Sequence, residues 1–210
     1  ERAIEAYQAE KKEPGTQNLR MVWNYSYLLY LLCMEDREPD KIRRFYEEAL
    51  RYAPLNCDFD YVMGRYHIGK GDWELAVCHL EQAFALLEEG GDLHFGMMLV
   101  PNRMEAGEYL AIACFNGGQK EKCVRVCADF LKEEPFAMGI LKVFLTAMKS
   151  VSAGAGQVLG FLGKLYDLSS LKDRLFVWKA AKEIGYEEAA QGLRTFFSPQ
   201  ELEALKGMGM

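Results

Sequence analysis

The feature of this sequence that most constrains its fold is a self-similarity at an offset of 34 residues. At this offset large apolar residues align with large ones and one alanine aligns with another: Tyr27 with Tyr61, Leu29 with Met63, Tyr46 with Leu80, Ala49 with Ala83, and Leu50 with Phe84. A small residue that recurs at a fixed place lets two helices pack closely. A period of this length is typical of stacked helical hairpins, because each hairpin buries its apolar face against its neighbours.

Residues 57–90 carry the most complete copy of the repeat. Gly69 and Gly71 predict the end of a first helix, and Asp72 is a suitable N-cap residue for a second one. The inner stripe expected for the second helix consists of Ala76, Leu80, Ala83, Phe84 and Leu87. The sequence therefore predicts a helical hairpin with a glycine turn.

The rest of the chain is predicted to extend this array. Residues 23–56 form a less complete copy, and residues 104–137 form a third copy after an apolar insertion at 91–103. Residues 1–22 are interpreted as the second helix of a truncated leading repeat plus a linker, and residues 138–210 as degenerate helical pairs with a capping helix. Since no alternating strand pattern occurs, the predicted fold is all-α, an α-α superhelix with degenerate C-terminal capping helices.

The final helix has a clear start signal. "Ser198-Pro199-Gln200-Glu201" combines a capping box with proline at the first helical position. An end helix of this kind would cover the last apolar face of an array.

The small residues and the turn resemble the tetratricopeptide repeat (TPR) family: Gly64, the Gly71-Asp72-Trp73 turn, Ala76 and Ala83. In that family the first helix of each pair lines a concave groove. The resemblance implies a partner-binding groove made of Asn24, Tyr27, Leu31, Asp58, Tyr61, Arg65, Glu105, Glu108 and Ile112. Tyrosine and arginine supply much of the energy at interfaces, which favours a peptide or a docking domain as partner. Alternatively, part of the tyrosines pack between repeats.

The insertion at 91–103 is too apolar for an idle loop. Its residues His94, Phe95 and Met98 are expected either to fold back onto the array or to contact a partner. The sequence pattern leaves both alternatives open.

Composition argues against several other functions. The net charge of −6 disfavours nucleic acid and anionic membranes as partners, since both are bound mainly through Lys and Arg. No apolar run reaches the roughly 20 residues of a membrane-spanning helix. The six cysteines contain no Cys-x-x-Cys pair and are interpreted as small buried residues in a reducing compartment, which predicts a cytoplasmic protein.

No cofactor, metal or catalytic site is predicted. Cys78 and His79 are neighbours on a helix and point about 100° apart, so they cannot easily bind one ion. Cys123 and Cys127 lie one turn apart, but two thiolates do not complete a zinc site. The glycines of "GAGQVLG" lack the spacing of a phosphate-binding loop. A small stand-alone enzyme with Cys or His in a pocket between helices is one alternative.

Three stretches resemble the TPR-containing C-terminal region of bacterial family 2 glycosyltransferases. They are "ERAIEAYQAEKKEP" at the start, "RMEAGEYLAIACFNGG" after the insertion, and the stretch from Phe161 to Phe197. The resemblance implies a piece of a longer protein with a catalytic domain in cis. Because no Asp-x-Asp metal motif and no Rossmann-like series of strands are expected here, any transferase activity would lie outside this chain. The main hypothesis is a non-catalytic interaction scaffold, and self-association is a further alternative.

Overall fold

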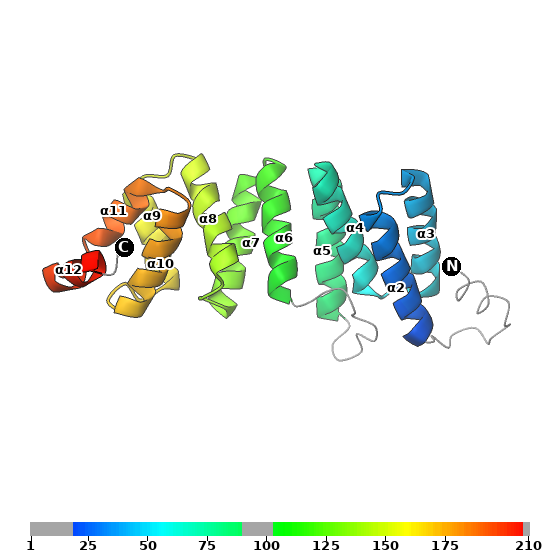
Figure 1. Ribbon diagram of the computed structural model, residues 1–210, viewed down its shortest axis with the longest axis horizontal. Helices are drawn as coiled ribbons and strands as arrows, with labels where there is room; N and C mark the ends of the chain where they lie inside the picture. Colours follow the sequence, from blue (N-terminus) through cyan, green and yellow to red (C-terminus); the bar gives the residue numbers. More distant parts are fainter. Residues whose placement is uncertain (1–18, 90–102, 208–210) are drawn as a thin grey trace. The chain divides into compact units, whose positions relative to one another are not determined.

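The computed structural model describes residues 19–89 and 103–207, and every regular element within these ranges is an α-helix (Figure 1). The chain divides into two compact units, one ending at Gly117 and the other beginning at Gly118. The helices of the first unit are α2 (Leu19–Met34), α3 (Pro39–Tyr52), α4 (Cys57–Lys70), α5 (Trp73–Glu89) and α6 (Arg103–Asn116). Those of the second unit are α7 (Lys120–Glu133), α8 (Met138–Ser150), α9 (Ala155–Leu165), α10 (Leu171–Glu183), α11 (Glu187–Arg194) and α12 (Pro199–Gly207). The prediction of an all-α helical-repeat fold is confirmed.

In the first unit the helices pack as hairpins in two layers. α2 packs against α3, and α4 packs against α5. α2 also contacts α4, and α4 contacts α6, so these three helices form one layer with α3 and α5 behind it. This order is what a stack of helical hairpins requires, because each hairpin buries its apolar face against the next.

The second hairpin reverses at the glycine turn that the sequence predicts. Gly71 has a left-handed backbone conformation (φ 76°), which glycine adopts without steric cost. The amide of Asp72 donates a hydrogen bond to the carbonyl of His67, and the amide of Gly71 donates one to Ile68. This pair of bonds satisfies the last carbonyls of α4, so the helix ends there and α5 begins at Trp73.

The same hairpin contains the closest helix contact of the repeat. A β-carbon added to Gly64 of α4 would lie 2.6 Å from Cγ of Leu80 on α5. Ala76 and Ala83, the small residues expected on α5, are buried. Glycine is therefore required at Gly64 because the side chain of Leu80 occupies the space where a β-carbon would lie.

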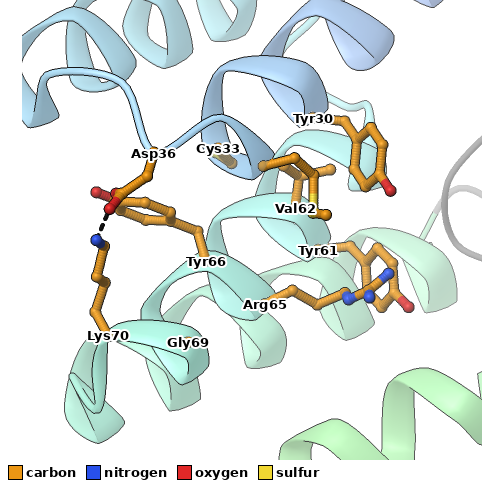
Figure 2. A pocket seen from close by; sticks show the side chains of 10 residues that line it. Tyr30, Cys33, Asp36, Tyr61, Val62, Arg65, Tyr66, Gly69 and Lys70 are labelled. Carbon is orange, nitrogen blue, oxygen red and sulfur yellow. Dashed lines mark ion pairs between the residues drawn. The ribbon is translucent and has the colours of Figure 1, made fainter.

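The first hairpin lacks this close contact. Tyr30 stands one period before Gly64, and its ring lines a pocket between α2 and α4 (Figure 2). A tyrosine is too large for the position at which Gly64 meets Leu80. The two hairpins therefore present different surfaces, although their sequences repeat.

A buried polar cluster joins the two hairpins of the first unit. Asp60 of α4, whose side chain is 3% exposed, accepts hydrogen bonds from Tyr46 Oη of α3 (2.7 Å) and from His79 Nδ1 of α5 (2.8 Å). The ring of His79 stacks on that of His67, with the ring centres 5.4 Å apart and the two planes 4° from parallel. His67 Nδ1 lies 3.4 Å from Asp72 Oδ2. A buried carboxylate needs such donors, so this polar cluster requires all three helices to be in place.

Cys78 and His79 differ in their surroundings. Cys78 is exposed on α5, whereas His79 is held between helices by Asp60. Within the described residues no group of three His, Cys, Asp or Glu side chains is arranged to hold a metal ion.

In the second unit, tyrosine side chains bond to the turns between helices. α7 contacts α8 and α9, α8 contacts α10, and α9 contacts α11. Tyr166 Oη donates to the carbonyl of Pro135, and Tyr186 Oη donates to that of Ala153, each at 2.5 Å. Both rings are buried, so each hydroxyl finds its acceptor in a chain turn instead of water.

The predicted capping box at the start of α12 is confirmed. The amide of Ser198 donates to Glu201 Oε2 (2.7 Å), and the amide of Glu201 donates to Ser198 Oγ (3.3 Å). Glu201 Oε1 also pairs with the buried Arg174 of α10 (2.7 Å). The cap defines the start of the last helix, and the ion pair ties that helix to α10.

Several predictions concern residues outside the described ranges. They include the truncated leading repeat before residue 19 and the insertion contacts His94, Phe95 and Met98. The repeat boundaries also stay predictions; the two hairpins of the first unit occupy 19–52 and 57–89. Among the described helices, none combines the length and apolar character needed to cross a membrane.

Replacing Gly64 should destabilise the first unit. The substitution Gly64→Ala places a methyl group against Leu80 and should cost about 1–3 kcal/mol of unfolding free energy. Gly69→Ala in the same helix is the matched control, since nothing lies within 4 Å of its added β-carbon. This control should be neutral or stabilising by about 1 kcal/mol. Urea unfolding followed by circular dichroism measures both; equal effects would contradict the packing described.

Acidification should weaken the first unit through His67. Burial lowers the pKa of His67, Asp72 opposes this effect, and the neighbouring His79 adds to it. The unfolded chain, in which histidine titrates near pH 6.5, therefore binds the proton at higher pH than the folded protein. The contribution of His67 to the unfolding free energy is complete above pH 6.5. It is lost as the pH falls through the pKa that His67 has in the folded protein.

The variant His67→Phe tests this origin, because phenylalanine keeps a ring against His79 but binds no proton. The urea midpoint should decrease from about pH 7.5 to about pH 5.5 in both proteins, and the decrease should be smaller for the variant than for the wild type. An equal fall in both proteins would assign the acid sensitivity to other groups.

Candidate functional site

α2 has apolar side chains on two opposite sides. No charged residue occurs between Met21 and Met34. One side packs into the core of the first unit through Met21, Val22, Tyr25, Leu29 and Leu32. The opposite side, here called the aromatic face, consists of Trp23, Tyr27, Tyr30 and Met34.

The aromatic face is open to solvent. Trp23 is 47% exposed, Tyr27 is 52% exposed and Met34 is 63% exposed, and the rings of Tyr27 and Tyr30 stack at 6.4 Å. A surface helix normally turns polar side chains outward. Adjacent exposed apolar side chains of this size mark a surface that contacts another molecule.

A pocket of about 520 Å³ opens beside the aromatic face, between α2 and α4 (Figure 2). The lining residues are Tyr30, Cys33, Met34 and Asp36 from α2 and the turn after it, and Tyr61, Val62, Arg65, Tyr66, Gly69 and Lys70 from α4. The buried Tyr61 and Val62 form its floor. At one end Asp36 and Lys70 form an ion pair (Figure 2).

Arg65 is an exposed cation of the site, held by aromatic rings. Its guanidinium lies 4.9 Å from the ring centre of Tyr109 on α6 and 5.7 Å from that of Tyr61. Figure 2 shows the side chain extended alongside the ring of Tyr61. No carboxylate among the described residues lies within ion-pair distance of Arg65. Cation–π contacts therefore fix its position but do not neutralise its charge.

Two ionisable groups of the pocket, Tyr61 and Cys33, are held in their neutral forms. Burial raises the pKa of Tyr61 to about 12, although Arg65 opposes the shift. Burial also raises the pKa of Cys33 to about 12. Neither group supplies an anion near pH 7. Apart from the Asp36–Lys70 ion pair, the pocket therefore offers hydrophobic and hydrogen-bonding contacts and the cation of Arg65.

The residues predicted from sequence to line the groove fall in several environments. Tyr61 and Arg65 line the pocket, and Tyr27 belongs to the aromatic face. The partly buried positions are Asn24 and Leu31 on α2, and Glu105, Glu108 and Ile112 on α6. Asp58 is fully buried and is not among the residues that line the pocket, which corrects its assignment as a contact residue.

Tyr27 and Tyr61 were expected to be equivalent, and they are not. Tyr61 is covered by Arg65 and Tyr109, with its ring 6.2 Å from that of Tyr109. In the repeat, Leu31 takes the place of Arg65 beside Tyr27, and Val62 takes the place of Tyr109. These smaller, uncharged side chains leave Tyr27 exposed.

Sequence reasoning missed part of the pocket. Tyr30, Cys33, Met34, Tyr66 and Lys70 line it but were not predicted. The spacing of Trp23, Tyr27, Tyr30 and Met34 was a usable signal, since these residues share one side of a helix without charges.

The triplet Asp58-Phe59-Asp60 has the Asp-x-Asp form of a metal-binding motif, which corrects the expectation that the chain carries none. Both carboxylates are buried in α4, two residues apart on a helix, so they point to different sides. Asp60 is bonded to Tyr46 and His79. The triplet therefore serves helix packing.

Comparisons with known proteins concern the fold. No protein-family model and no curated protein matches the sequence. Among solved structures, the chain is similar to YrrB, a TPR protein described as having an unusual peptide-binding site. The similarity covers 100% of this chain and 97% of that chain, with 13% identity and a TM-score of 0.53. The chain thus has the fold of a TPR protein, as its repeat pattern predicts.

Alkylation should modify Cys78 in preference to Cys33 and Cys57. The thiolate is the reactive form of cysteine, and burial holds the pKa of Cys33 and of Cys57 near 12, whereas Cys78 is exposed. Iodoacetamide at about pH 8, followed by mass spectrometry of peptides, should label Cys78 well before Cys33. Rapid labelling of Cys33 would reveal an activated thiol in the pocket and would favour the enzyme alternative.

Proposed function

We propose that this chain is a non-catalytic interaction module that binds a protein or peptide segment on the layer formed by α2, α4 and α6. The observation that carries the proposal is the aromatic face of α2. It is free of charged residues, exposed, and continuous with the pocket beside α4. The similarity to YrrB, a TPR protein with a peptide-binding site, supports the same class of ligand.

The site's side chains suit an extended polypeptide. Trp, Tyr and Arg are the residues that most often dominate binding energy at interfaces, and Trp23, Tyr27 and Arg65 supply all three types. The pocket is large enough for apolar side chains, and the aromatic face continues along α2 beyond it. An extended chain could place successive side chains on these surfaces.

The setting of the module is also part of the proposal. Its stretches that resemble family 2 glycosyltransferases support a place beside a sugar-transferring domain in the bacterial cytoplasm. There it would position a partner, or the catalytic domain itself. In the full-length parent protein we expect a series of strands carrying Asp-x-Asp ahead of Glu1, and a parent without it would contradict this setting.

Peptide selection with groove variants tests the binding function. Peptides selected on the chain from a random display library should shift NMR signals of α2, α4 and α6. Tyr27→Ala should weaken binding about tenfold or more. Leu75→Ala is the matched control, since Leu75 is 50% exposed on α5, outside the proposed site.

Two outcomes would contradict this proposal. One is a selection that yields no peptide whose affinity depends on Tyr27. The other is a concentration-dependent mass in sedimentation that Tyr27→Ala abolishes, which would show that a second copy of the chain occupies the face.

A further inference from the structure

We infer that the bound segment carries one acidic side chain two or three residues from a large apolar side chain. The carboxylate binds Arg65, and the apolar side chain enters the pocket between α2 and α4. This inference rests on the proposed peptide binding and adds the chemistry of the ligand.

The apolar part of the motif follows from the pocket lining. Tyr30, Met34, Val62 and Tyr66 present rings and aliphatic groups to the pocket, and Cys33 is held as a neutral thiol. The charged groups at one end, Asp36 and Lys70, neutralise each other. A large aliphatic or aromatic side chain would therefore gain the most by leaving water here.

The acidic part follows from Arg65. Its guanidinium is positioned by Tyr61 and Tyr109 before any ligand arrives, so little entropy is lost when it binds. A guanidinium donates two parallel N–H bonds to a carboxylate. Since no described carboxylate lies within ion-pair distance of Arg65, an external carboxylate would meet an unneutralised cation.

The spacing follows from the helix layer. Arg65 of α4 contributes to the lining of the pocket between α2 and α4, and its guanidinium extends to Tyr109 of α6. Axes of packed helices are about 8–10 Å apart, and an extended chain advances about 3.3 Å per residue. Two or three residues therefore separate a side chain in the pocket from one at Arg65.

A single acidic residue is expected because acidic side chains of the protein lie nearby. Glu105 contributes to raising the pKa of Tyr61, which places its charge near the Arg65 site. Glu108 follows one turn later on α6. A ligand with several adjacent acids would place the extra charges near these carboxylates.

The probe is a phage library of random dodecapeptides joined to the coat protein, so that side chains are its only source of peptide carboxylates. Selection on the wild-type chain should enrich Asp or Glu two or three residues from Phe, Leu, Ile, Trp or Tyr. Selection on Arg65→Gln should not enrich the acid. Arg43→Gln is the matched control, because Arg43 is an exposed cation on α3 that pairs with Asp40; it should behave as the wild type.

Amidated synthetic copies of the enriched peptides then give affinities by fluorescence anisotropy. Changing the acid to its amide, or Arg65 to Gln, should each weaken binding about tenfold. Combining both changes should add little more, which identifies the two groups as partners.

Peptides that depend on Tyr27 but are indifferent to Arg65 and to the acid would overturn this inference and leave the proposed function standing. Absence of any Tyr27-dependent peptide would overturn both. A preference for a free C-terminal carboxylate over a side-chain acid, tested with non-amidated peptides, would also overturn it.

Discussion

The close approach of α4 to α5 at Gly64 is the contact on which the first unit depends. With no β-carbon at this position, Leu80 can lie against the backbone of α4. The buried alanines of α5 extend the same contact. The distance between α4 and α5 decides which side chains of α4 are enclosed between the two helices. It also decides which side chains of α4 reach the layer that this helix shares with α2 and α6. The pocket therefore depends on a residue that does not line it.

The polar cluster around Asp60 acts at the same junction by different means. Apolar packing tolerates small shifts between helices, whereas hydrogen bonds from Tyr46 and His79 to one carboxylate oxygen do not. Removing either donor would leave a buried carboxylate under-bonded. The cluster thus fixes the relative register of α3, α4 and α5.

Sequence reasoning could predict the array because its informative residues act locally. Gly71, Asp72 and Gly64 have their effects within one hairpin, and the period of 34 made them visible. The environment of Tyr61 could not be predicted in this way, because Tyr109 belongs to another repeat beyond the insertion. Asp58 was misplaced for a related reason, since burial depends on how neighbouring helices close around a residue and not on its polarity alone.

The presence of Tyr30 where the second repeat has Gly64 bears on how a ligand can be seated. A perfectly regular array offers every ligand several equivalent positions along its axis, and a bound chain could slide between them. In this unit the pocket, the aromatic face and the ring-held Arg65 each occur at one place among the described residues. Because the repeat is irregular, a ligand of the proposed kind would bind this unit in one register and one direction.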